Sequence, residues 1–355
     1  MFLNLGLLLV FSTFGGVSAV CGLLAAPARR KTSEGMDQNL LHILIPAHNE
    51  EKKIAYTFES IEQEWKRCPF PIKITVGMDS CTDGTAAVVS AWSSRLPITG
   101  QNFSYRSKWK NLKALVQGAD PSARWVFLVD AGTVLDEGVF ASLRNQMTDP
   151  DVAALAPSYR MEGSSQLHAW FWMFERQLKT WENNLGGPIS IHGAAVAYRR
   201  DVIQAVYAKL EGEGEFKNDD VILPLASRVF FPDLKIRYLP NTYIHDNADH
   251  EKLDFKTQWI RRKRMVLGNL QWLRFAIREE KRMSGKVWVV ALRRILRPFW
   301  FVSFLILSLG LFFYSPVLAM FLLIPGVLFL PAALASLYAP IAFLRREDQV
   351  DSTWR

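Results

Sequence analysis

The chain has 355 residues, half of them hydrophobic, and 42 lysines and arginines outnumber 34 acidic residues, which gives a net charge of +8. This length and composition allow one catalytic domain with membrane segments. The basic residues gather beside apolar segments, as cytoplasmic membrane flanks do, so a nucleic-acid partner is not expected. The cysteines Cys21, Cys68 and Cys81 have neither C-x-x-C spacing nor a partner histidine cluster, so neither a zinc site nor a disulfide framework is indicated.

The first apolar segment, residues 2–28, is uncharged for longer than the roughly 20 residues that a bilayer core requires. It predicts an amino-terminal transmembrane anchor over residues 1–28. A cleaved signal peptide is the alternative, because residues 25–28 are mostly small. The positive charges at residues 29–31 follow the apolar segment instead of preceding it, which favours an anchor with its amino terminus outside.

Residues 39–255 alternate apolar runs with stretches of helical spacing. This alternation predicts an α/β domain with a mostly parallel sheet covered by helices. Ligands of such sheets collect at the carboxyl ends of the strands, so polar residues at those ends are candidates for a site. Strands are predicted at residues 40–48, 72–79 and 124–133, and helices at residues 50–65 and 82–92.

Polar motifs follow each of these three strands. The first motif spans Pro46 to Glu50 and contains His48, the second spans residues 79–85, and the third spans residues 130–133. One such residue alone is an ordinary turn or helix-cap residue. Three polar strand ends in chain order indicate a shared binding site.

The carboxy-terminal part is basic and apolar. In residues 256–297, lysines and arginines mix with tryptophan and leucine at helical spacing, which predicts amphipathic helices in a membrane interface. Helices packed on the soluble domain are the alternative. Residues 298–344 are uncharged, with a break near residues 314–316 and arginines at both ends, so a transmembrane hairpin is expected before a cytosolic tail, residues 345–355. This layout predicts a multi-pass protein of the cytoplasmic membrane with its catalytic domain in the cytosol.

The motifs resemble those of the inverting glycosyltransferases of family 2, whose nucleotide-sugar-binding fold is called GT-A. The likeness covers about residues 39–265, and its last motif is that of membrane synthases, as in processive synthases and ceramide glucosyltransferases. Pro46–Glu50 matches P-x-[YHR]-N-E, Asp79–Thr85 loosely matches D-x-S-x-D-x-T with Cys81 at the usual serine, Asp130 begins the acidic D-x-D motif, residues 218–223 match [TE]-[ED]-D-x-x-L, and Gln258–Arg262 match Q-x-x-R-W.

The resemblance implies a nucleotide-sugar donor, expected to be a UDP-sugar, and a set of residues that bind it. Glu50 and Asp79 would accept hydrogen bonds from the base or the ribose, because ionised carboxylates are acceptors. A lysine would contact the phosphates, and the spacing does not choose among Lys108, Lys110 and Lys113. The implied donor-binding residues are Pro46, His48, Glu50, Asp79, Lys108, Lys113, Asp130 and Gln258.

The resemblance also implies the chemical roles. Asp130 would bind Mg²⁺ or Mn²⁺ bridging the diphosphate, and Asp220 would act as general base on the acceptor hydroxyl in a single in-line displacement. Arg261 and Arg262 would bind the departing diphosphate. On the acceptor side, the implied residues are Gly193 and Asp219.

Two positions depart from the family motifs. Gly132 stands where the second acid of D-x-D is usual, which leaves fewer carboxylates for the cation. Arg262 replaces the tryptophan of Q-x-x-R-W, an aromatic that lies near the acceptor sugar in processive synthases. His192 is expected to be structural, and the aromatic row from Trp170 to Trp181 is expected to pack rather than to stack on sugars.

The preferred hypothesis is an active transferase that acts on a polysaccharide or saccharide acceptor. A lipid acceptor, ceramide-like or polyprenyl-linked, is the alternative, with membrane lipids and secretion or synthase proteins as partners. A catalytically silent scaffold of a polysaccharide synthase is the second alternative, motivated by Gly132 and Arg262. A dinucleotide enzyme is not favoured, because no G-x-G-x-x-G follows a strand.

Overall fold

The structure is a computed structural model that describes residues 2–13, 15–26, 40–160, 166–246, 255–296, 300–313, 315–316 and 319. At residues 2–3, 166–171, 255–263, 300–302 and 304 the description covers the backbone and not the side chains. The chain divides into two compact units. The sheet unit comprises residues 27–252 with 351–355, and the helical unit comprises residues 1–26 and 253–350.

The sheet unit is built on one mixed sheet with the strand order β3-β2-β1-β4-β7-β6-β8-β5. Strands β3, β2, β1 and β4 run parallel, whereas β7 is antiparallel to both β4 and β6. The predicted α/β sheet is therefore confirmed, with parallel order in its first half and mixed order in its second. The strands are β1 Leu41–Ala47, β2 Ile72–Asp79, β3 Ile98–Phe103, β4 Trp125–Val129, β5 Thr133–Leu135, β6 Val152–Tyr159, β7 Ala195–Arg199 and β8 Lys235–Asp246.

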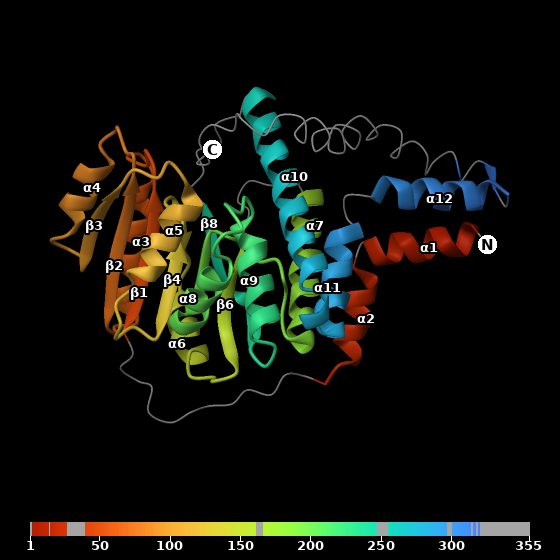
Figure 1. Ribbon diagram of the computed structural model, residues 1–355, viewed down its shortest axis with the longest axis horizontal. Helices are drawn as coiled ribbons and strands as arrows, with labels where there is room; N and C mark the ends of the chain where they lie inside the picture. Colours follow the sequence, from red (N-terminus) through yellow and green to blue (C-terminus); the bar gives the residue numbers. More distant parts are fainter. Residues whose placement is uncertain are drawn as a thin grey trace. The chain divides into compact units, whose positions relative to one another are not determined.

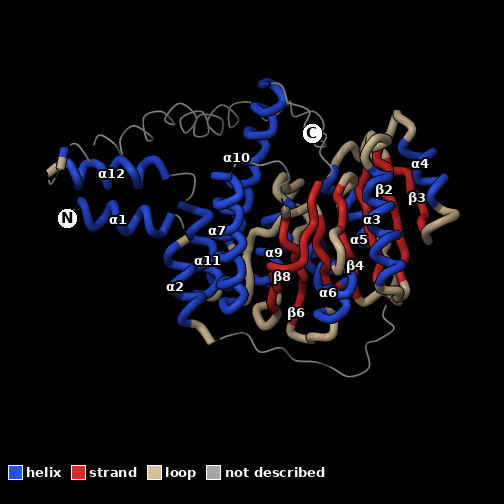
Figure 2. The backbone as a smooth tube through the Cα atoms, turned by 180° about the vertical axis from the view of Figure 1, so that it is seen from behind, coloured by secondary structure: helices blue, strands red, loops and turns tan. Residues whose placement is uncertain are grey.

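Helices cover both faces of this sheet (Figures 1 and 2). Helices α3, α4 and α6 contribute to the core on one face, and α5, α8 and α9 pack together on the other. Helix α5 begins where the Ser107 hydroxyl accepts a hydrogen bond from the Lys110 amide at 3.2 Å. The helices are α3 Ile54–Arg67, α4 Thr85–Trp92, α5 Lys108–Gln117, α6 Val139–Gln146, α7 Gln166–Glu182, α8 Arg200–Lys209 and α9 Asp219–Phe230, with a 3₁₀ turn at Asn183–Leu185.

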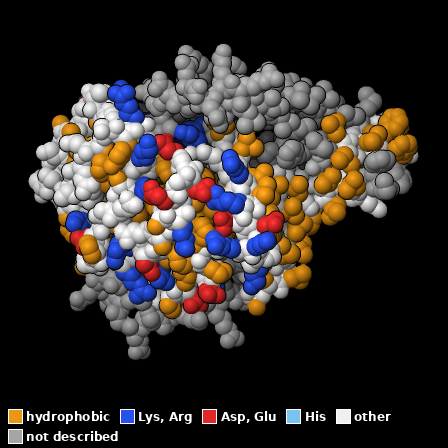
Figure 3. All heavy atoms as spheres, viewed as in Figure 1, with side chains coloured by type: hydrophobic (Ala, Val, Ile, Leu, Met, Phe, Trp, Pro, Cys, Tyr) orange, Lys and Arg blue, Asp and Glu red, His pale blue; other side chains and the backbone are white. Residues whose placement is uncertain are grey.

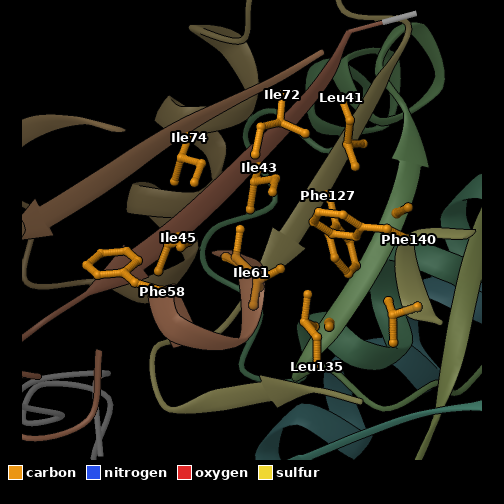
Figure 4. Close-up of a cluster of buried hydrophobic side chains, with 14 of the residues drawn as sticks. Leu41, Ile43, Ile45, Phe58, Ile61, Ile72, Ile74, Phe127, Leu135 and Phe140 are labelled. Carbon is orange, nitrogen blue, oxygen red and sulfur yellow. The ribbon is translucent and has the colours of Figure 1, made fainter. Parts of the chain in front are cut away.

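The hydrophobic core of the first face explains why the central strands are apolar at successive positions. Every residue of β1 is buried, because helices cover the sheet on both sides. Figure 4 shows Ile43 and Ile45 of β1 beside Phe58 and Ile61 of α3, with Phe127 of β4 in the same cluster. This packing fixes the strand ends, where the polar motifs lie.

The helical unit contains α1, α2, α10, α11 and α12. Helix α1 packs along α12, and the hydroxyls of Thr13 and Ser303 share a buried hydrogen bond of 3.0 Å. A side chain at Gly6 would lie 2.4 Å from the backbone of Leu307, so this close approach requires glycine. The bounds are α1 Phe2–Thr13, α2 Gly16–Leu24, α10 Phe255–Arg278, α11 Gly285–Leu296 and α12 Trp300–Phe312, with a 3₁₀ turn at Glu280–Arg282.

The membrane predictions have mixed outcomes. Among the described residues, no single helix is long and apolar enough to cross a bilayer, and α1 with α2 meets that requirement only as a pair bent by 72°. The single helix expected for residues 1–28 is thus two helices. The helices expected at residues 256–297 are present as α10 and α11. Helix α12 begins the predicted hairpin, most of which lies outside the described residues, as does the tail at 345–355.

Exposed large hydrophobic side chains are concentrated in the helical unit. Figure 3 shows them over α1 and α2, whereas lysines, arginines and acids are interspersed over the sheet unit. On α1, α2 and α12 the exposed residues are Leu5, Leu7, Leu8, Phe11, Val20, Leu23, Leu24, Leu305, Leu309 and Phe312.

Candidate functional site

The candidate site lies at the carboxyl end of β4, where Asp130 follows the strand. The Lys108 ammonium lies 2.7 Å from the Asp130 carboxylate and 3.5 Å from that of Asp219. Lys108 is in the first turn of α5 and Asp219 in the first turn of α9, so two helix amino termini meet one strand end. The Asp130 side chain is 36% exposed, which leaves it open to a ligand.

Desolvation at the strand end and the neighbouring charges both act on the pKa of Asp130, although part of its side chain remains accessible. Burial is the main cause that raises the pKa of Asp130 to about 6, while Lys108 opposes the shift and Asp219 and Asp246 add to it. Asp246 ends β8, and the Thr133 hydroxyl donates to its carboxylate at 3.5 Å. Asp246 was not among the residues predicted from the sequence, although it ends an apolar strand just as the predicted Asp79 does.

The cluster fits a divalent cation that takes few ligands from the protein. Among the described residues, no group of three or more His, Cys, Asp or Glu side chains is placed to hold a metal. Gly132 has a φ of +93° in the turn between β4 and β5, and its amide donates to the Thr57 hydroxyl at 2.9 Å. A cation would therefore rest on the Asp130 carboxylate, with oxygens of a diphosphate and of water completing its shell, as Mg²⁺ commonly requires. The carboxylates of Asp219 and Asp246 near Asp130 favour such a charge, whereas the Lys108 ammonium opposes it.

The predicted base, Asp220, lies beside this cluster. A small cavity in the sheet unit is lined by Asp130, Asp219, Asp220 and Gly193 among others. A Cβ at Gly193 would lie 3.2 Å from the Cβ of Asp220, and the Ile191 amide donates to the Asp220 carbonyl at 3.1 Å. The structure thus brings together the four residues that the sequence placed at the metal, the base and the acceptor.

The three candidate lysines contact different acidic residues. Lys108 contacts Asp130, whereas Lys110 pairs with Glu215 at 3.0 Å and Lys113 forms an ion pair with Glu211. The contact with the donor phosphates predicted for Lys108 and Lys113 stays a prediction. Of the three lysines, Lys108 is the one that contacts Asp130.

The first strand end is held by its own polar residues. A ring nitrogen of His48 donates to the carbonyl of Asp79 at 2.6 Å, and the Glu50 amide donates to the Thr85 hydroxyl at 2.8 Å. Burial raises the pKa of Glu50, with Lys53 opposing the shift. Glu50 therefore remains a candidate donor contact, whereas His48 ties the first strand end to the second, and Pro46 is buried within β1.

Asp79 has a positioning role that sequence reasoning did not anticipate. Its side chain is fully buried, and its two carboxylate oxygens accept the amides of Arg106 at 2.9 Å and Ser107 at 2.8 Å. The hydrogen bond to a base or ribose predicted for Asp79 stays a prediction. The two observed contacts fix the loop that leads into α5, and thereby the position of Lys108.

The remaining predicted residues lie in the helical unit. The backbone of Gln258, Arg261 and Arg262 belongs to α10, and their side chains lie outside the described residues. Their contacts with the donor diphosphate therefore stay predictions.

Three solved structures illustrate what the chain is similar to. The mannosyltransferase PcManGT from Pyrobaculum calidifontis, in complex with GDP-Man and Mn²⁺, is 16% identical with a TM-score of 0.63, covering 98% of this chain and 100% of that one. TarS from S. aureus with UDP-GlcNAc is 13% identical with a TM-score of 0.49, covering 76% and 80%. Glucosyl-3-phosphoglycerate synthase from Mycobacterium tuberculosis, with Mn²⁺, UDP and phosphoglyceric acid, is 15% identical with a TM-score of 0.43, covering 69% and 84%.

The likeness to PcManGT shows a shared fold and, at this identity, nothing finer. No curated protein matches the chain in sequence. The family model for glycosyl transferase family 2 matches residues 42–207, which include the ends of β1, β2 and β4. The model for glycosyl transferase family group 2 matches residues 125–335, more than half of the chain and including Asp130 and Asp220. The chain belongs to glycosyl transferase family group 2.

Proposed function

We propose that the protein transfers a sugar from a nucleotide-sugar donor to an acceptor hydroxyl, with inversion at the anomeric carbon. The observation that carries this proposal is the meeting of Asp130, Lys108 and Asp220 where β4 ends and α9 begins. A leaving diphosphate requires positive charge, and an attacking hydroxyl requires a base. The cluster supplies both within the sheet unit.

A divalent cation, Mg²⁺ or Mn²⁺, would be held by Asp130 and would offset the charge that develops on the leaving diphosphate. PcManGT, which shares the fold, was solved with GDP-Man and Mn²⁺, and this supports a nucleotide-sugar donor and a metal for this chain. A UDP-sugar was expected from the sequence motifs. Both nucleotides therefore belong in the donor panel.

The chain's own groups provide the remaining chemistry. Lys108 would bind the diphosphate, with its ammonium shared between the acids and the phosphate oxygens. Asp220 would remove the proton of the acceptor hydroxyl as the oxygen attacks the anomeric carbon from the face opposite the nucleotide. Gly193 leaves space for the acceptor beside Asp220, because no side chain occupies that position. One displacement gives inversion.

The proposal includes attachment to the cytoplasmic membrane through the helical unit, with the sheet unit in the cytosol. The exposed apolar side chains of α1 and α2 support it. The acceptor would be a saccharide or a lipid-linked molecule, and secretion or synthase proteins would be partners. Protease protection of tags at the two termini tests this topology, and protection of both tags on one side contradicts it.

The decisive experiment measures nucleotide release by the full chain in lipid, with a panel of UDP- and GDP-sugars and acceptors, with and without Mn²⁺. Asp220→Asn should lower the turnover by roughly 10²- to 10⁴-fold while donor binding persists, because it removes the base alone. Asp233→Asn, an exposed position outside the site, is the matched control and should retain turnover. Unchanged turnover in Asp220→Asn contradicts the assignment of the base.

A silent scaffold is the second candidate, favoured by Gly132 and by the lack of a three-ligand metal cluster among the described residues. Calorimetric titration with the same donors separates the two candidates. Absence of any nucleotide binding supports the scaffold, whereas donor binding that Lys108→Gln weakens supports the transferase.

A further inference from the structure

A second, larger cavity lies in the sheet unit, and its lining does not include the candidate base. Its volume is about 320 Å³, within the range of small-molecule sites, and all of its described lining residues belong to the sheet unit. They come from the ends of β6, α7 and β8 and from His192, which directly precedes Gly193. No residue of this cavity except His192 was singled out from the sequence as part of a motif, and the aromatic row that includes Trp172 was expected to pack.

Aromatic rings form one wall of this cavity. The rings of Tyr159 and His192 stack with centroids 3.7 Å apart and planes 9° apart, and Trp172 meets His192 edge to face at 6.4 Å. Tyr238 and Tyr243 also line the cavity. Flat rings with polar edges offer a surface to the apolar face of a ring-shaped ligand. Trp172 and His192 therefore line a binding surface in addition to packing.

Cations also line the cavity, and they lie over the rings of Tyr243 and Tyr238. Arg160, Arg176 and Lys179 outnumber the single lining acid, Glu175. Arg160 is paired with Asp136 at 3.1 Å, which lies outside the lining. In the described part of the chain, Arg176 makes no ion pair: its guanidinium donates to the Tyr243 hydroxyl and lies over that ring at 5.8 Å. Its charge is thus available to a ligand.

Two links connect the cavity with the catalytic cluster: a hydrogen bond and a pair of residues adjacent in the chain. The Tyr159 hydroxyl donates to Asp246 at 3.0 Å, and Asp246 is one of the acids that act on Asp130. On the other side, His192 leads into Gly193, which faces Asp220. A ligand in the cavity would meet His192, whose neighbour in the chain, Gly193, contacts Asp220.

We propose that this cavity binds the acceptor and that the acceptor carries a phosphate group held by Arg176 with help from Lys179. The planar guanidinium binds phosphate oxygens in pairs, and the stacked rings of Tyr159 and His192 hold the carbon part of the acceptor. The chemistry is the same for a phosphorylated saccharide and for a lipid phosphate. The acceptor role depends on the proposed transferase function, whereas phosphate binding does not.

The test is calorimetric titration of the full chain in phosphatidylcholine nanodiscs with glucose 6-phosphate and with glucose. A second arm measures binding of the protein to phosphatidylcholine vesicles with and without phosphatidic acid. Arg176→Gln should weaken binding of the phosphate compound at least tenfold, and Arg176→Lys less. Lys209→Gln, which removes one exposed charge outside the cavity, should bind as the wild type does.

The Lys108→Gln variant distinguishes this cavity from the donor site. Phosphate binding that survives Lys108→Gln and is lost in Arg176→Gln supports the proposal, and the arm in which it occurs identifies a soluble or a lipid source. Binding that is lost in Lys108→Gln instead, or that Arg176→Gln leaves intact in both arms, overturns it. Turnover with a phosphorylated acceptor that Arg176→Gln does not alter would overturn it while leaving the transferase function standing.

Discussion

The contact between Gly193 and Asp220 makes the position of the proposed base testable without removing it. A methyl group at residue 193 would lie 3.2 Å from the Cβ of Asp220, closer than ordinary contact, so Asp220 would have to shift by a few tenths of an ångström. Since a misplacement of about 1 Å costs about 10²-fold in rate, Gly193→Ala should lower kcat roughly threefold to tenfold. Gly193→Val should lower it further.

The assay is steady-state nucleotide release, with donor affinity measured by calorimetry. Donor affinity should be unchanged, because Gly193 contacts Asp220 and not Lys108. Gly285→Ala, a position in α11 with nothing within 4 Å of the added methyl, is the control and should leave kcat unchanged. A Gly193→Ala variant with wild-type kcat, or with weakened donor binding instead, would refute the reasoning that Asp220 acts on the acceptor.

Two further predictions concern the donor and the stability of the sheet. Lys108→Gln should weaken donor binding roughly tenfold by calorimetry, because it removes a charge-assisted contact, while the matched Lys110→Gln should not. His42 is buried between the Thr75 hydroxyl at 2.8 Å and the Asp120 amide at 2.9 Å, and burial lowers its pKa from 6.5 to about 4. Between pH 6.5 and about 4, His42 is protonated in the unfolded chain and neutral in the native chain. The free energy of unfolding therefore decreases as the pH falls through this range, by up to about 3 kcal/mol. Urea unfolding at pH 7 and 4.5 should show this loss in the wild type and not in His42→Gln.

The first half of the sheet could be predicted from the sequence because its rules are local. Apolar runs of strand length alternate with helices, and parallel strands place their carboxyl ends along one edge. The meeting of Glu50, Asp79 and Asp130 on that edge followed from chain order alone. Their individual tasks did not follow, because an aspartate after a strand serves equally to bind a ligand or to hold a loop, and Asp79 holds the loop before Lys108.

Other features depend on contacts between distant segments. The sequence spacing does not distinguish Lys113 from Lys108, because the ion pair of Lys113 with Glu211 joins residues 98 positions apart. Asp246 reaches the site because β8 pairs with β5, so that it lies opposite Thr133. Hydropathy likewise does not predict the bend between α1 and α2, because a mean over the segment carries no information about the direction of the helix axes.

The change of strand direction after β4 explains why donor and acceptor residues meet. Strand β7 runs antiparallel to β4, so the segment that precedes β7 lies beside the carboxyl end of β4, and the Asp130 amide donates to the Ala194 carbonyl at 2.7 Å. A parallel β7 would have placed Gly193 at the opposite edge of the sheet. The antiparallel pairing instead brings Gly193, and with it Asp220, next to the acid that would hold the cation. Substitutions before α5 should therefore act on donor binding, and substitutions at residues 192–193 and 219–220 should act on turnover and on the choice of acceptor.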